Sequence, residues 1–72
     1  MQFTAVIEKS ESGWYIGQIE EVPAVLSQGR TIKELKENLV DALILIFEAN
    51  REAMKVEYEG KIVLRDVIAL PE

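Results

Sequence analysis

The sequence contains no cysteine and no histidine among its 72 residues. Without cysteine the chain forms no disulfide and no thiolate metal site. Without histidine it lacks the commonest general base and every triad that uses one. We therefore expect no nucleophilic serine or threonine, no cofactor and no bound metal.

Positive charge is also scarce. The chain has 8 Lys and Arg against 13 Asp and Glu, for a net charge of −5. Nucleic-acid binding needs clustered Lys and Arg, whereas the basic residues here alternate with acidic ones. We expect no direct nucleic-acid binding and no operator recognition, and an acidic surface suited to a basic protein partner.

Long apolar runs are missing as well, since none approaches the ~20 residues of a membrane span. The N-terminus carries no signal-peptide pattern. These features predict a cytoplasmic protein without membrane contact. The length predicts one small domain over residues 1–72, near the size at which a single core is marginally stable.

The dominant element is a predicted helix over residues 31–54, which holds no glycine or proline. Thr31 and Glu34 form a capping-box pattern at its start. At ~100° per residue one apolar stripe contains the following residues: Ile32, Leu35, Leu39, Ala42, Leu43, Ile46, Phe47, Ala53 and Met54.

Further apolar residues lie outside this stripe, namely Val40, Ile44 and Leu45. A helix that is apolar around most of its girth needs cover on more than one side. At ~1.5 Å per residue the helix would also be longer than a short strand, so it should overhang the sheet. We therefore expect a homodimer, with a tetramer as a further possibility.

Strand patterns occupy the first part of the chain. Residues 2–9 and 14–19 alternate around a turn that contains Gly13, which predicts a β-hairpin. Residues 25–28 form a short third strand after Pro23, which does not fit a central strand. Gly17 indicates either a bulge or a close backbone approach.

Residues 61–70 are rich in β-branched residues and predict a fourth strand, parallel to the first, in spatial order 3-2-1-4. A small hairpin that pairs 56–58 with 62–64 is the alternative. The predicted fold is α+β: a three-stranded antiparallel sheet plus a fourth strand, with one long helix on one face.

The order and spacing of several short motifs resemble the HicB family of antitoxins over about the first 50 residues. The matching segments are the opening strand at 3–9, the Gly-aromatic strand at 13–17, the proline loop at 21–23 and the helix entry at 27–31. Glu34, Asn38 and Ala42 also match family positions. Arg30 departs from the acidic residue usual before the helix threonine, and Ala24-Val25 replaces the usual Gly-Cys.

The resemblance implies a partial ribonuclease H-like fold and a non-enzymatic antitoxin-like module. Such a module would bind and occlude a small, basic, mRNA-cleaving toxin of the HicA type. Fuller antitoxins carry a C-terminal DNA-binding domain. Only 18 residues follow Met54, so we expect the toxin-binding half without the repressor half.

Two alternatives stay open: a small ligand-binding or metal-dependent ribonuclease H-like enzyme that uses the open sheet face, and an orphan oligomeric domain. The carboxylates available for metal-assisted hydrolysis are Glu8, Glu20, Asp41, Glu48 and Asp66, which we expect to be surface charges. Trp14 and Tyr15 should face opposite sides of the sheet. The residues expected in a partner or dimer interface are Trp14, Val40, Ile44, Leu45, Val63 and Val67.

Overall fold

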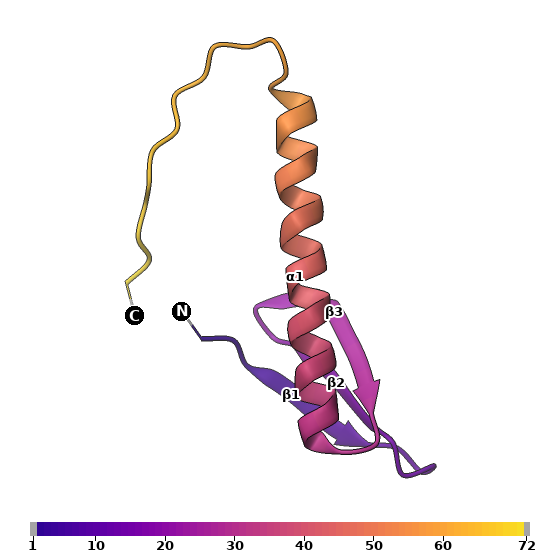
Figure 1. Cartoon of the computed structure of the whole chain (residues 1–72). Helices are drawn as coiled ribbons and strands as arrows, with labels where there is room; N and C mark the ends of the chain where they lie inside the picture. The colour runs from indigo at the N-terminus through magenta and orange to yellow at the C-terminus, as the bar shows by residue number, and fades with distance from the viewer. Residues whose placement is uncertain (1, 72) are drawn as a thin grey trace.

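A computed structural model describes residues 2–71, which contain one sheet and one long helix (Figure 1). The elements are β1 (Ala5–Lys9), β2 (Tyr15–Ile19), β3 (Val22–Gly29) and α1 (Ile32–Glu57). Over the described residues the sheet has the order β1-β2-β3 and is antiparallel throughout. The α+β class and the three-stranded sheet with one long helix are therefore confirmed.

The β1–β2 hairpin forms as the alternation predicts. Its turn is closed by a hydrogen bond from Gly13 N to Ser10 O at 3.0 Å, and Gly13 has a φ of 91°. This φ favours glycine because a Cβ atom is disfavoured there. Across the hairpin Lys9 pairs with Tyr15 and Ala5 pairs with Ile19.

The third strand is longer than the sequence predicts, because β3 begins at Val22 and includes Pro23. Proline is tolerated there because β3 is an edge strand of the described sheet. The β2–β3 register shifts between Gln18 and Ile19. The Gln18 side-chain amide donates to the Pro23 carbonyl at 2.7 Å, which satisfies a backbone acceptor at this irregularity.

The helix begins at the predicted cap. Glu34 N donates to Thr31 Oγ1 at 3.0 Å, which is one half of the capping box. The other half differs: the Glu34 carboxylate accepts from Arg30 N at 3.3 Å rather than from Thr31 N. The acidic side chain thus binds the backbone one residue earlier. The helix ends at Glu57, three residues beyond the predicted Met54.

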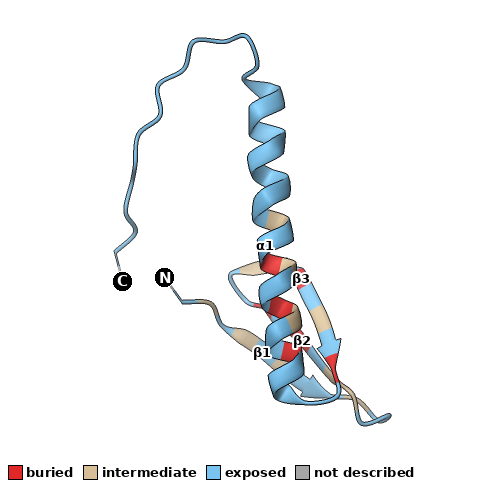
Figure 2. Ribbon diagram, viewed as in Figure 1, coloured by how far each residue is buried: buried red, intermediate tan, exposed pale blue. Residues whose placement is uncertain are grey.

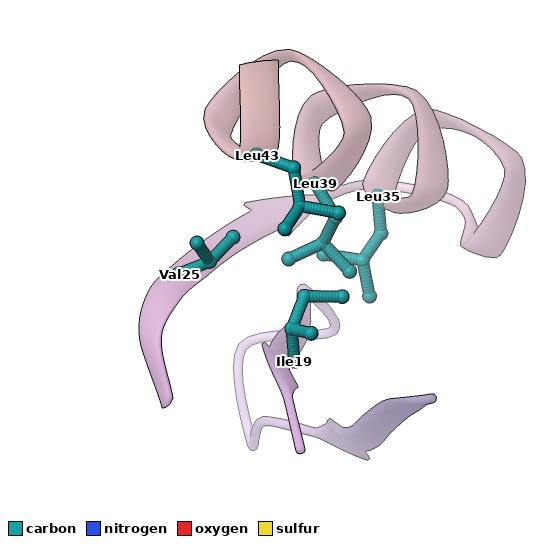
Figure 3. Close-up of a cluster of buried hydrophobic side chains, with 5 residues drawn as sticks. All are labelled: Ile19, Val25, Leu35, Leu39 and Leu43. Atoms are coloured by element: carbon teal, nitrogen blue, oxygen red, sulfur yellow. The ribbon is translucent and has the colours of Figure 1, made fainter. Parts of the chain in front are cut away.

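The core lies between α1 and one face of the sheet (Figure 3). Leu35, Leu39 and Leu43 are buried at successive turns of α1, against Ile19 of β2 and Val25 of β3. These three leucines, spaced four residues apart, form the central part of the predicted apolar stripe. Gly17 lets the helix approach closely, since a Cβ atom there would lie 3.0 Å from Leu35 Cδ2. The close-approach alternative for Gly17 is therefore the correct one.

The helix extends far beyond this core. Leu43 is its last buried residue, and the following turns are largely exposed (Figure 2). The fourteen residues that follow Leu43, up to Glu57, correspond to roughly 21 Å of helix. The predicted overhang is thus present. Met54, which the stripe predicted to be buried, is 52% exposed because no sheet lies beneath it.

The expected fourth strand over residues 61–70 does not form in the described chain, where no strand follows α1. The alternative hairpin does not form either, because Val56 lies inside α1. A turn at Gly60, with φ 76°, instead sends residues 61–71 back in the opposite direction to α1 (Figure 1). Strand propensity is realised only beside a partner strand, and over the described residues this segment pairs with none.

Candidate interaction surfaces

The sheet has one open face. The antiparallel register places Val6, Gln18 and Leu26 side by side, followed by a row of Glu8, Ile16 and Gln28. These positions alternate with the helix-facing residues of each strand, so they point away from α1. They form the surface that we call the open sheet face.

Three large apolar side chains lie exposed on the open sheet face. Val6 is 56%, Ile16 is 42% and Leu26 is 60% exposed. Glu8, Gln18 and Gln28 alternate with them, so the face combines apolar contacts with hydrogen-bonding groups. An apolar patch with polar neighbours is typical of a protein-binding surface.

Val6, Ile16 and Leu26 are not among the interface residues that the sequence predicts. A signal for them was present, because Val6 lies between Ala5 and Ile7, and Leu26 follows Val25. A strand that is apolar at consecutive positions is apolar on both faces. Each of these residues therefore takes the face that α1 does not cover.

Of the two neighbouring aromatic residues, Tyr15 faces the helix side of the sheet, which is one half of the prediction. Tyr15 packs against the core, whereas Trp14 is half-buried outside it. The Arg30 guanidinium lies 5.1 Å from the centre of the Trp14 ring, within the range of a cation–π contact. Trp14 therefore links the hairpin to the segment just before α1, and part of its ring remains available to a partner.

Glu21 ties the β2–β3 turn to the start of the chain. Its carboxylate accepts from Thr4 N at 2.7 Å and from Thr4 Oγ1 at 2.7 Å. The backbone hydrogen bond from Thr4, followed by the hydroxyl bond, lowers the pKa of the Glu21 carboxyl below its ordinary value. A hydrogen bond from Glu20 N to Thr4 O at 2.9 Å closes the same junction.

The candidate metal-binding carboxylates are dispersed. Glu8 lies on β1, Glu20 in the β2–β3 turn, Asp41 and Glu48 on α1, and Asp66 in the segment after α1. Residues 2–71 contain no group of three Asp or Glu close enough to hold one ion. Asp66 instead accepts from Val67 N at 2.8 Å. In this same part of the chain, no helix has the length and apolar character needed to cross a membrane.

The interface residues expected on α1 are all exposed: Val40, Ile44 and Leu45 have exposed fractions of 53%, 49% and 67%. Val40, Ile44 and Phe47 share one flank, since they are spaced four and three residues apart. Phe47 leans toward the start of β1, with its ring centre 6.0 Å from that of Phe3. This flank therefore borders the β1 side of the sheet, while Leu45 lies about 100° further round the helix.

The two interface residues expected after α1 lie apart from this flank. Val63 lines a hollow at the end of the helix with Met54 and Tyr58. Val67 lies further along and is 91% exposed. The single chain therefore does not bring the six expected interface residues together into one surface.

The chain is similar to several small proteins called UPF0150 proteins. One from Archaeoglobus fulgidus is 32% identical over 60 residues, which cover 83% of this chain and 87% of the relative. Two from Synechocystis are 40% identical over 47 residues and 39% identical over 54 residues, which cover 68% and 75% of those relatives. No protein-family model matches, and no solved structure matches significantly. On its similarity to these relatives, the chain belongs to the UPF0150 family.

Proposed function

We propose that this protein is an antitoxin-like interaction module that binds and occludes a small, basic, mRNA-cleaving toxin of the HicA type. The proposal rests on the resemblance of the first 50 residues to HicB antitoxins and on the shape of the sheet. The observation that carries it is the open sheet face, where Val6, Ile16 and Leu26 lie uncovered.

An open sheet face with exposed apolar residues can cover a partner's active site without contributing any chemistry of its own. The neighbouring glutamine and glutamate side chains can hydrogen-bond to a polar rim around that site. In this mechanism the module acts by blocking access of the RNA to the toxin.

Charge supports the same partner class. A protein with a net charge of −5 attracts a basic protein and steers its approach. The RNA-binding surface of a ribonuclease must itself be basic to bind phosphates. Occlusion of that surface would therefore pair opposite charges and place an acidic protein where the RNA would bind.

Binding to a small basic protein encoded beside this one provides the test. We expect the wild-type chain to bind it in isothermal titration calorimetry and to suppress its RNA cleavage at equimolar ratio. Ile16→Glu places a charge in the centre of the open sheet face and should weaken binding at least about tenfold. Ile32→Glu is the matched control: Ile32 is also exposed but lies at the start of α1, where an acidic residue is favourable.

Two outcomes would overturn the proposal. Equal binding by wild type and Ile16→Glu would show that the open sheet face is not part of the interface. Metal-dependent RNA cleavage by the isolated wild-type chain, lost in Asp66→Asn, would favour the enzyme alternative instead.

A further inference from the structure

The single chain exposes more surface than a compact protein of its mass. Its accessible surface is 6457 Å², whereas a folded monomer of 8.2 kDa exposes about 4,500 Å². Its radius of gyration is 16.1 Å, against about 11 Å for a compact domain of this length. The excess of roughly 1,900 Å² per chain is of the size that permanent homodimers bury.

This excess lies in two places: the overhanging half of α1 and the segment after it (Figure 2). The apolar residues Ile62, Leu64, Val67 and Ile68 are all at least 87% exposed. On α1 the flank of Val40, Ile44 and Phe47 is also largely exposed. Both features lack cover, and neither is part of the open sheet face.

The two edges of the sheet differ in a way that selects where a further strand can join. The β3 edge carries Pro23, which lacks a backbone donor, and the register shift beside it. The β1 edge has no proline and no irregularity in its register from Ala5 to Lys9. Among the described strands, β1 is therefore the edge that accepts a new strand.

We propose that a second copy of this chain completes the fold: two chains pair about a two-fold axis, and residues 66–70 of each form a fourth strand on β1 of the other. The axis passes α1 at its midpoint, between Ile44 and Leu45. The two helices then run antiparallel, with the flank of Val40, Ile44 and Phe47 at their contact. This closed pairing leaves no open-ended contact for further growth.

The direction of the chains fits this arrangement. Lys9 pairs with Tyr15, Tyr15 pairs with Gly29, and Gly29 lies against Leu35 N, so the Lys9 end of β1 is beside the start of α1. In the antiparallel pair, the end of the partner's helix lies beside the start of this chain's α1, and so near the Lys9 end of β1. The partner's segment therefore enters at Lys9 and runs toward Ala5, antiparallel to β1.

Side-chain chemistry selects the register. When Lys9 lies opposite Asp66 of the partner subunit, Ile7 lies opposite the partner's Ile68 and Ala5 opposite the partner's Leu70. Lys9 and the partner's Asp66 then form a charge pair at the end of the two strands, and the apolar pairs face the helix layer. Shifting the partner's strand by two residues would place the partner's Asp66 beside Ile7 on the helix-facing side of the sheet. Shifting it by one residue would turn its helix-facing side chains to the open sheet face.

The same segment fits its own sheet less well. It runs opposite to α1, as β1 does, so it could join its own β1 only in parallel. Pairing within one chain would also leave the flank of Val40 and Ile44 in water, where these side chains are 53% and 49% exposed.

Engineered cysteines test the exchange directly, because the natural chain has none. We expect the full-length double variant Lys9→Cys with Asp66→Cys to form, on mild oxidation, a disulfide-linked dimer in non-reducing electrophoresis. Lys9→Cys with Val67→Cys is the control; its second cysteine is one residue out of register and should cross-link poorly. An intrachain disulfide at monomer mass would overturn the proposal in favour of pairing within one chain.

Sedimentation equilibrium tests the helix contact independently of the disulfide. The wild-type chain should sediment as a dimer at micromolar concentration, and Ile44→Glu should raise the dissociation constant at least about tenfold. Leu45→Glu is the matched control, because Leu45 is at least as exposed but lies outside the shared flank. A wild-type monomer of 8.2 kDa, or equal effects of the two variants, would contradict the pairing. Neither result depends on toxin binding, so failure here is distinguishable from failure of the proposed function.

Discussion

The Asn38 side-chain amide donates a hydrogen bond to the backbone carbonyl of Gln28 over 2.8 Å. The bond joins the second turn of α1 to the end of β3, across the connection formed by Arg30 and the Thr31 cap. Asn38 is one of the positions at which the sequence resembles HicB antitoxins. The structure gives this asparagine a role in docking the helix on the sheet.

Asn38→Asp should therefore destabilise the fold. The carboxylate cannot donate and repels the Gln28 carbonyl, so we expect a loss of about 1 kcal/mol in the free energy of unfolding. Urea denaturation at fixed protein concentration measures it. Asn50→Asp makes the same chemical change at an exposed helix position and should stay within about 0.5 kcal/mol of wild type. Equal effects of the two variants would show that the hydrogen bond contributes nothing.

The glycines of β2 and β3 predict a graded response to an added methyl group. A Cβ atom at Gly29 would lie 2.6 Å from Leu35 N, which is backbone and must shift as a unit. At Gly17 the nearest atoms are the δ-methyl groups of Leu35 and Leu39, which can rotate. We expect Gly29→Ala to cost about 1–3 kcal/mol and Gly17→Ala to cost less.

Thermal unfolding by circular dichroism checks this order. Both substitutions replace glycine by alanine inside a strand, so the comparison largely cancels the difference in chain entropy. The reverse order would mean that the leucine contacts, rather than the helix backbone, limit the approach of α1 to the sheet.

The helix, its cap and the β1–β2 hairpin could be predicted from the sequence because their signals are local. Thr31 with Glu34 marks the start of the helix, and alternation around Gly13 marks the hairpin. The leucine spacing also identified the core stripe. These features depend on neighbours within a few residues along the chain.

The errors arise where structure depends on a distant partner. Met54 has the right helical phase for burial, but no part of the sheet reaches it. Residues 61–70 have the composition of a strand, but composition does not specify which edge they join or in which chain. Val6, Ile16 and Leu26 were missed as site residues because only the sheet register shows that they share a face.

Removal of a core leucine should affect stability far more than removal of an exposed one. Leu39 is 2% exposed and lies between Ile19 and the neighbouring leucines, so Leu39→Ala should cost about 2–5 kcal/mol. Leu45→Ala removes the same atoms from a side chain that is 67% exposed, and should change stability by less than about 0.5 kcal/mol. Urea unfolding of both variants at one concentration gives the comparison. A large loss in Leu45→Ala would indicate that Leu45 is buried by a contact outside the single chain.

The junction between Thr4 and Glu21 predicts a pH-dependent contact. The folded chain holds the pKa of the Glu21 carboxyl below its ordinary value, chiefly through the Thr4 backbone N–H and secondly through its hydroxyl. A carboxylate with a lowered pKa stabilises the fold above its ordinary pKa, and this contribution is lost as the pH falls through the lowered value. Glu21 is solvent-exposed, so we expect a local effect on the junction rather than global unfolding.

Thr4→Val removes the hydroxyl and keeps the backbone donor, so the pKa of Glu21 should rise part of the way toward its ordinary value. Thr4→Ser keeps both donors and should leave it low. Carboxyl chemical shifts of Glu21 followed by NMR during an acid titration report the pKa in each variant, and an identical pKa in Thr4→Val and wild type would show that the hydroxyl bond does not form in solution.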